Sequence, residues 1–121
     1  MVLVDVAWPD RREDVAIALD VLAGEPPSLL RNGRDPRKPD VTDAVHWLVD
    51  DTGWDSRSPA ESVGLILRDD AEAGAIAKVV AAIVEVSRRQ GATAPDAAWF
   101  ADEAWPRVRA SAAHAVTLLR S

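Results

Sequence analysis

The chain of 121 residues has no cysteine. Disulfide bonds, thiolate metal ligands and thiol nucleophiles are therefore excluded, and with them several classes of enzyme. Because a chain without disulfides suits a reducing compartment, we expect a cytoplasmic protein.

The sequence also lacks a long apolar run. No stretch approaches the roughly 18 apolar residues that a membrane-spanning helix needs. Residues 1–6, "MVLVDV", are apolar, but they are few, carry no basic residues in front and are interrupted by Asp5. They do not resemble a signal peptide, and we expect no contact with a membrane.

Positive charge is scarce. The 14 lysines and arginines face 20 aspartates and glutamates, which gives a formal net charge of −6. Nucleic-acid binding draws on clustered basic side chains, so it is not expected. The one basic stretch is residues 31–38, and the charge balance as a whole predicts a protein partner with a basic surface.

What is present indicates one all-α domain over residues 1–121. Apolar residues recur at helical spacing in several segments, and a further helical turn is expected at 95–100. The pattern predicts a compact bundle of about five helices of unequal length. These helices cover residues 10–23, 41–51, 59–67, 70–90 and 105–119. The helix over 70–90 is apolar around much of its circumference and is expected to be the central element.

Local signals mark several helix starts. Ser58, Pro59 and Glu61 form a capping-box pattern at the start of the third helix. Asp10 is placed to cap the first helix, and Trp8 is placed to pack against its first turn.

Two segments are predicted to be non-helical. Residues 25–40 hold four of the eight prolines and the turn dipeptide "NG", so they are expected to form a proline-rich basic loop. Residues 1–8 are expected to be disordered or to pair with another chain.

The segment 46–55, "HWLVDDTGWD", concentrates the residues that invite a functional hypothesis. On a wheel of about 100° per residue, the apolar residues of the second helix share one face. Asp43, His46, Trp47 and Asp50 share the opposite face. Trp47 is unexpected there, and two explanations stay open: another element of the chain covers it, or it is a contact for a partner.

Asp50 and Asp51 raise a second question, because the dipole at a helix C-terminus disfavours anions. An arginine from residues 31–38, or Arg68, would compensate them. The alternatives are a basic partner surface and metal or acid–base chemistry.

The metal hypothesis rests on His46 and Asp50, which are four residues apart on one helical face. Asp43 lies on the same side, but a site needs further ligands. His114 is the only other histidine, and its helix position predicts that it faces water. Ser111 shares that face without an acid nearby to orient the histidine, which is typical of a surface pair.

The sequence contains no catalytic serine, zinc-protease, phosphate-loop or dinucleotide-binding motif. These absences favour a protein without catalytic activity, and no cofactor is expected. Five tryptophans are expected to be mainly core residues. After Trp47, Trp54 in the turn at 53–58 is the one expected to be exposed.

Four short segments resemble a family of small uncharacterised actinobacterial proteins. They are "HWLVDDT" at 46–52, "VGLIL" at 63–67, Gly91 with Pro95-Asp96, and Trp105-Pro106. The resemblance covers roughly residues 42–119 and implies a helical, cytoplasmic protein; it supplies no substrate.

The sequence therefore predicts an acidic protein-binding module, in the specific form of an inhibitor or immunity-type protein that meets a basic surface. The predicted contact residues are Asp43, His46, Trp47, Asp50, Asp51 and Trp54. One alternative is a metal-dependent hydrolase with His46 and Asp50 as ligands. Another is a homodimeric structural protein with Trp47 in its interface.

Overall fold

The computed structural model describes residues 6–24, 44–50, 52–54, 56–91, 94 and 96–121. Within these ranges the elements are helical, with no strand and one isolated bridge between Val63 and Leu67. The predicted all-α class is confirmed. The helices are α1 (Pro9–Ala23), the π-helix η1 (His46–Asp50), the 3₁₀ helix η2 (Pro59–Ser62), α4 (Asp70–Gln90), α5 (Asp96–Phe100) and α6 (Trp105–Leu119). The predicted loop at 25–40 lies outside the described residues.

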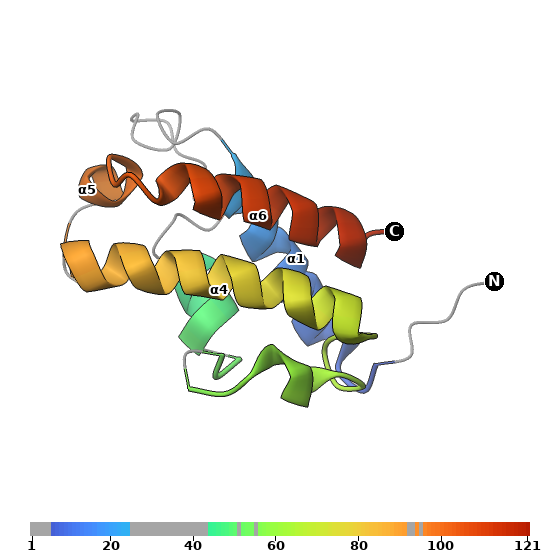
Figure 1. Ribbon diagram of the computed structural model, residues 1–121. Helices are drawn as coiled ribbons and strands as arrows, with labels where there is room; N and C mark the ends of the chain where they lie inside the picture. The colour runs from blue at the N-terminus through green and yellow to red at the C-terminus, as the bar shows by residue number, and fades with distance from the viewer. Residues whose placement is uncertain (1–5, 25–43, 51, 55, 92–93, 95) are drawn as a thin grey trace.

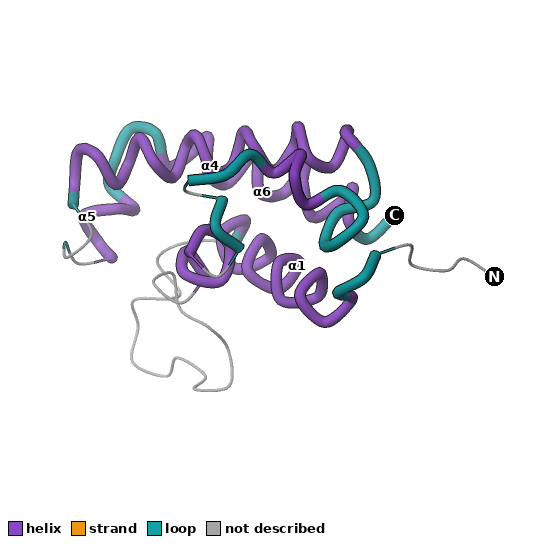
Figure 2. The backbone as a smooth tube through the Cα atoms, turned by 90° about the horizontal axis from the view of Figure 1, so that it is seen from below, coloured by secondary structure: helices purple, strands orange, loops and turns teal. Residues whose placement is uncertain are grey.

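The three long helices form two layers. α4 and α6 lie side by side and run in opposite directions, with α1 behind them (Figure 1). The view turned by 90° separates α1 from the α4 and α6 pair (Figure 2). α6 packs extensively on both α1 and α4, so α6 is the central helix. The prediction that gave α4 this place was wrong, because alanines on its outer face are apolar in sequence yet exposed in the fold.

A continuous core fills the space between these layers. Apolar side chains from α1, η1, α4 and α6 meet there, together with residues from the turns around η2. The largest side chains that are almost fully buried are Leu19, Leu22, Leu48, Leu67, Ile76, Val15, Val79, Val86 and Val108. In the complete set of buried apolar residues, spacings of three and four residues recur along α1, α4 and α6, which is the pattern from which those helices were predicted.

α1 begins differently from the prediction. Pro9 occupies the first turn, and Trp8 is the N-cap residue without a side-chain capping bond, so Asp10 does not cap the helix. The backbone N–H groups of Ala7 and Trp8 donate to the carbonyls of Gly64 and Leu65, at 3.0 and 2.8 Å. Ala7 and Trp8 are thus bonded to their own chain. Residues 1–5, which the prediction of disorder or pairing also covers, lie outside the described residues.

η2 has the predicted capping box, formed by Ser58 and Glu61, but it ends at Ser62 and not at residue 67. The reason is local: the carbonyl of Ser62 accepts the N–H groups of residues 65, 66 and 67, which closes a compact turn in place of a further helical turn. Gly64 has a φ of +90° within this turn. The α4, α5 and α6 segments were predicted to within about one residue.

Candidate functional site

His46 and Asp50 lie on η1 as an exposed pair. The Nδ1 atom of His46 contacts the Oδ2 atom of Asp50, one helical turn away, and both side chains remain at least half exposed. The two residues therefore share a face, as predicted. Asp43 and Asp51, the other two predicted acidic contacts, lie outside the described residues.

Trp47 is half-buried and packs against the edge of the core. η1 is a π-helix, whose bonds join residues five apart, so each residue turns through a smaller angle than the 100° of an α-helix. The α-helical wheel therefore placed Trp47 too far round. Of the two explanations left open for Trp47, the structure supports coverage by the same chain.

Trp54 is buried, with 3% of its surface exposed, so the expectation that it is exposed was wrong. Its indole N–H donates to the Ser62 hydroxyl at 3.0 Å, and its backbone N–H donates to the Thr52 hydroxyl at 3.2 Å. The Thr52 hydroxyl itself donates to the carbonyl of Leu48 at 2.6 Å. The end of "HWLVDDTGWD" is thus a turn that anchors a tryptophan in the core.

Among the described residues, the cation near the end of η1 is Arg57, which was not predicted. The Arg57 guanidinium donates to the carbonyl of Thr52 at 2.7 Å. Arg68 instead binds Glu72, and residues 31–38 lie outside the described part. The described residues contain no group of three or more side chains suited to a metal ion.

The structure also describes Ser111 and His114, the pair that the sequence placed on the surface of the last helix. His114 is exposed on α6, as predicted. The Ser111 hydroxyl donates to the carbonyl of Arg107 in its own helix, which is an arrangement typical of a helix surface.

A buried ionic cluster, which the sequence analysis missed, joins three helix ends. Glu72 at the start of α4 is 2% exposed and accepts two bonds from Arg12 of α1, at 2.7 and 2.8 Å. Arg12 also donates to the carbonyls of Ile66, at 3.1 Å, and of Leu119 at the end of α6, at 2.9 Å. The backbone N–H and the Nε of Arg68 complete the contacts of Glu72, at 2.8 and 2.9 Å.

The surroundings of Glu72 set its ionisation. Burial alone would raise the pKa of Glu72, but hydrogen bonds from Arg12 and from the backbone and side chain of Arg68 outweigh it and lower the pKa from 4.5 to about 2. A carboxylate that accepts this many charged donors stays ionised, so the cluster is a fixed ion network.

Asp102 forms a second buried network between α5 and α6. Arg89 of α4 pairs with it, Gln90 donates to it at 2.8 Å, and the backbone N–H of Ala104 donates at 2.8 Å. The hydrogen bond from Arg89, followed by those from Gln90 and Ala104, lowers the pKa of Asp102 well below its usual value.

The signal for the first cluster was present in the sequence. Arg12 precedes Val15 and Leu19 by three and seven residues, and Glu72 precedes Ile76 and Val79 by four and seven. One opposite charge therefore lies on the apolar stripe of each helix, a pattern that predicts a buried pair.

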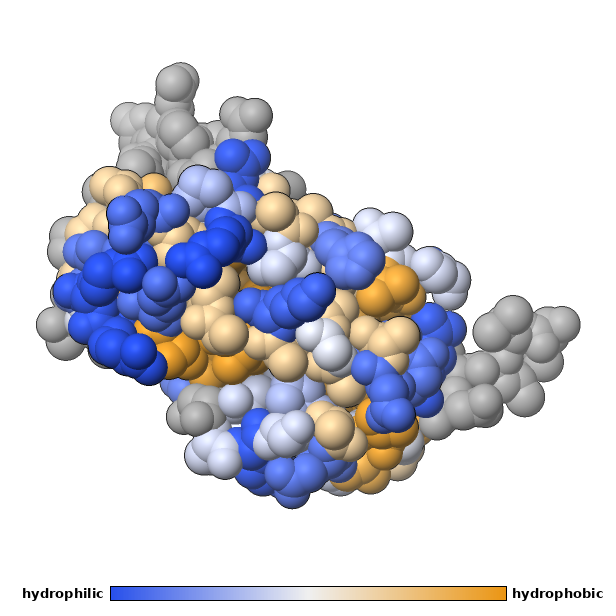
Figure 3. Space-filling model, in the orientation of Figure 1, coloured by the Kyte–Doolittle hydropathy of each residue, from blue (hydrophilic) through white to orange (hydrophobic). Residues whose placement is uncertain are grey.

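The largest exposed apolar side chains of the described part form what we call the Trp8 patch: Trp8 (49% exposed), Val63 (36%) and Leu65 (36%). The hydrogen bonds of Ala7 and Trp8 to Gly64 and Leu65 bring the two segments together. Figure 3 shows hydrophobic surface at the lower right, in the region where residues 56–68 lie in Figure 1.

The described residues form an all-α domain with two buried ion networks, around Glu72 and Asp102, and one exposed apolar patch. The chain belongs to a family described as a domain of unknown function, DUF7945, which matches residues 6–121. The resemblance to an uncharacterised family is confirmed at this level. No curated protein and no solved structure matches the chain. Among the described helices, none is long and apolar enough to cross a membrane.

Proposed function

We propose that this protein is a non-catalytic protein-binding module and that the Trp8 patch is its docking surface. The observation that carries the proposal is the joint exposure of Trp8, Val63 and Leu65 at one place on a domain whose other large apolar side chains, among the described residues, are buried or partly buried. Exposed apolar clusters of this kind are typical of interaction sites.

The patch suits binding because its backbone is already fixed. Trp8 is the N-cap residue of α1, and the hydrogen bonds from Ala7 and Trp8 to residues 64 and 65 hold both segments of chain in place. Less conformational entropy is then lost when a partner binds. Tryptophan is also among the residues that contribute most to interface free energy.

Charge around the patch indicates the chemistry of the partner. Exposed acidic residues lie within a few positions of the patch in the sequence, and the whole chain carries −6. They are Asp10, Glu61, Asp69 and Asp70. We therefore propose a protein partner that presents an apolar side chain between lysines and arginines, as an inhibitor or immunity-type role would require.

The exposed pair His46 and Asp50 is the second candidate surface. It keeps the predicted acidic character, but its neighbour Trp47 is partly committed to the core and Trp54 is wholly so. A partner that used this face would have less apolar area to bury, so the Trp8 patch is preferred.

The proposal can be tested with a random peptide library displayed on phage and selected on the wild-type protein. Enriched peptides should carry an apolar residue flanked by lysine or arginine. Trp8→Ala should weaken their binding at least about tenfold, the change expected when an interface tryptophan is lost. Asp50→Ala, on the other surface, is the matched control and should leave binding unchanged.

Three outcomes would overturn the proposal: no enriched peptide, enrichment of acidic peptides, or binding that Trp8→Ala leaves intact. Because Trp8 is half exposed, its replacement should leave the fold unchanged, and circular dichroism verifies this before binding is measured.

A further inference from the structure

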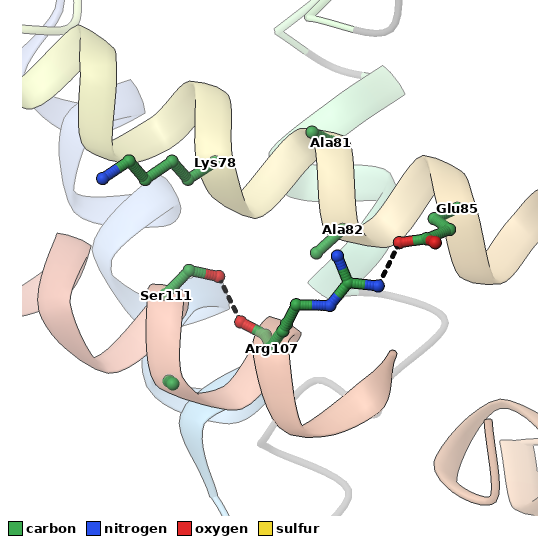
Figure 4. A pocket seen from close by; sticks show the side chains of 7 residues that line it. Lys78, Ala81, Ala82, Glu85, Arg107 and Ser111 are labelled. Atoms are coloured by element: carbon green, nitrogen blue, oxygen red, sulfur yellow. Dashed lines mark hydrogen bonds and ion pairs between the residues drawn. The ribbon is translucent and has the colours of Figure 1, made fainter. Parts of the chain in front are cut away.

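A groove of about 420 Å³ runs between α4 and α6, on a face separate from the residues of the Trp8 patch. Figure 4 shows Lys78 and Ser111 toward one end of the groove, Glu85 at the other and Ala82 between them, with the Arg107 side chain reaching from α6 to Glu85. The groove residues are Lys78, Ala81, Ala82, Glu85, Arg107, Ala110 and Ser111.

The charges of the groove differ in how they are satisfied. Glu85 pairs with Arg107 and, at 3.3 Å, with Arg89. Lys78 is exposed and has no hydrogen bond or ion pair within the part of the chain that the structure describes. Its ammonium is therefore the charge of the groove that is open to an outside carboxylate.

The spacing along α4 suggests where such a carboxylate comes from. Lys78 and Glu85 are seven residues apart, which is two helical turns, so they lie on the same face of α4. Both line the groove, with Ala81 and Ala82 midway between them. Along α4 itself the order is therefore positive, small and negative, which is complementary to the same order reversed. At the negative end Glu85 keeps its pairs with Arg107 and Arg89, so a lysine from outside would join an existing ion network.

We propose that a second copy of this chain occupies the groove, with the two α4 helices antiparallel about a twofold axis at Ala81 and Ala82. In this arrangement Lys78 of each copy faces Glu85 of the other, and both contacts form at once because a twofold interface is isologous. The proposal concerns a different face from the Trp8 patch and does not depend on it.

The middle of the strip permits the close approach that the pairing needs. Ala81 of α4 and Ala110 of α6 are exposed, and with the buried Ala82 they leave no long side chain in the middle of the groove, so that another helix can approach closely. Pairing would cover these methyl groups, and the charges at the rim would fix the direction of the helices.

Sedimentation equilibrium of the full chain tests the proposal. The wild type should have twice the monomer mass. Lys78→Glu and Glu85→Lys should each be monomeric, because each places two pairs of like charges across the interface. An equimolar mixture of the two variants should recover the dimer mass, since every contact in the mixed dimer joins opposite charges.

Glu103→Lys is the matched control, because it makes the same charge change at an exposed site outside the groove, and it should remain dimeric. The inference is overturned if the wild type is monomeric, if either single variant keeps the dimer mass, or if the mixture stays monomeric. Trp8→Ala should also remain dimeric, which separates this result from the test of the proposed docking surface.

Discussion

Gly53, in the turn that follows η1, has a backbone conformation that other residues rarely adopt. Its φ is +78°, and its N–H donates to the carbonyl of Asp50 at 3.2 Å. A Cβ atom at this position would lie 3.0 Å from the Nε of Arg57, the side chain that binds the Thr52 carbonyl. The turn that carries Trp54 into the core therefore depends on a glycine here.

Two glycine substitutions should change stability in opposite directions. Gly53→Ala should lower the free energy of unfolding by about 1–3 kcal/mol, because alanine must adopt a positive φ and displace Arg57. Gly74→Ala, within α4, should raise it by about 0.5–1 kcal/mol, because a Cβ there meets no described atom within 4 Å and alanine favours the helix. Urea unfolding measures both changes; equal signs would contradict this reading of the turn.

Trp54 also shows what residue-level pattern reading missed. The turn at 53–58 was predicted, but the direction of a side chain in a turn is set by contacts outside the local pattern. Here the contacts are Ser62, eight residues later, and the core itself. Capping signals are local, and for that reason the capping box at Ser58 was predicted correctly.

At the scale of the helices, the cluster of Arg12, Glu72 and Arg68 joins the start of α1, the start of α4 and the end of α6. Arg12 binds the carbonyl of Leu119, and Arg68 binds that of Leu118 at 3.1 Å. These carbonyls are in the last turn of α6, where a helix leaves carbonyls without the usual intrahelical partner, and that of Leu118 also accepts the backbone N–H of Ser121 at 3.3 Å. The cluster thus fixes three helix ends and satisfies the end of one of them.

The sequence predicted where the helices lie along the chain, but it did not predict which helices pack against one another. The apolar residues of α4 and of α6 recur at the period of an α-helix, and that period can be read directly from the sequence. Which helix lies at the centre depends on how all three pack, and exposed alanines on α4 resemble core residues in a linear pattern. The π geometry of η1 had no sequence signal that we could identify.

Ionisation of Glu72 should make the free energy of unfolding depend on pH. Its pKa in the folded state, about 2, lies below the ordinary value of 4.5, so its contribution is complete above about pH 4.5 and is lost as the pH falls toward 2. From this difference the loss is on the order of 3 kcal/mol. Glu72→Gln should be less stable at neutral pH and should approach the wild type near pH 2, as measured by urea unfolding across this range. Parallel curves for the two proteins would contradict the role assigned to the cluster.

At the scale of the whole molecule, the described part has an apolar core with two buried ion networks, and two surfaces of different character. The Trp8 patch is apolar with acidic residues close by in the sequence, and the α4 and α6 groove is small and self-complementary in charge. The net charge of −6 acts over both and favours basic partners at long range. On this account one surface serves a different protein and the other serves a second copy.

The most direct measurement of the central claim is an NMR titration of the ¹⁵N-labelled protein with a peptide enriched on the wild type. The indole N–H signal of Trp8 and the amide signals of residues 63–65 should shift progressively. The indole signals of the buried Trp54, Trp99 and Trp105 should stay in place. An unchanged Trp8 signal, or shifts centred on His46 and Asp50, would contradict the claim that the Trp8 patch is the docking surface.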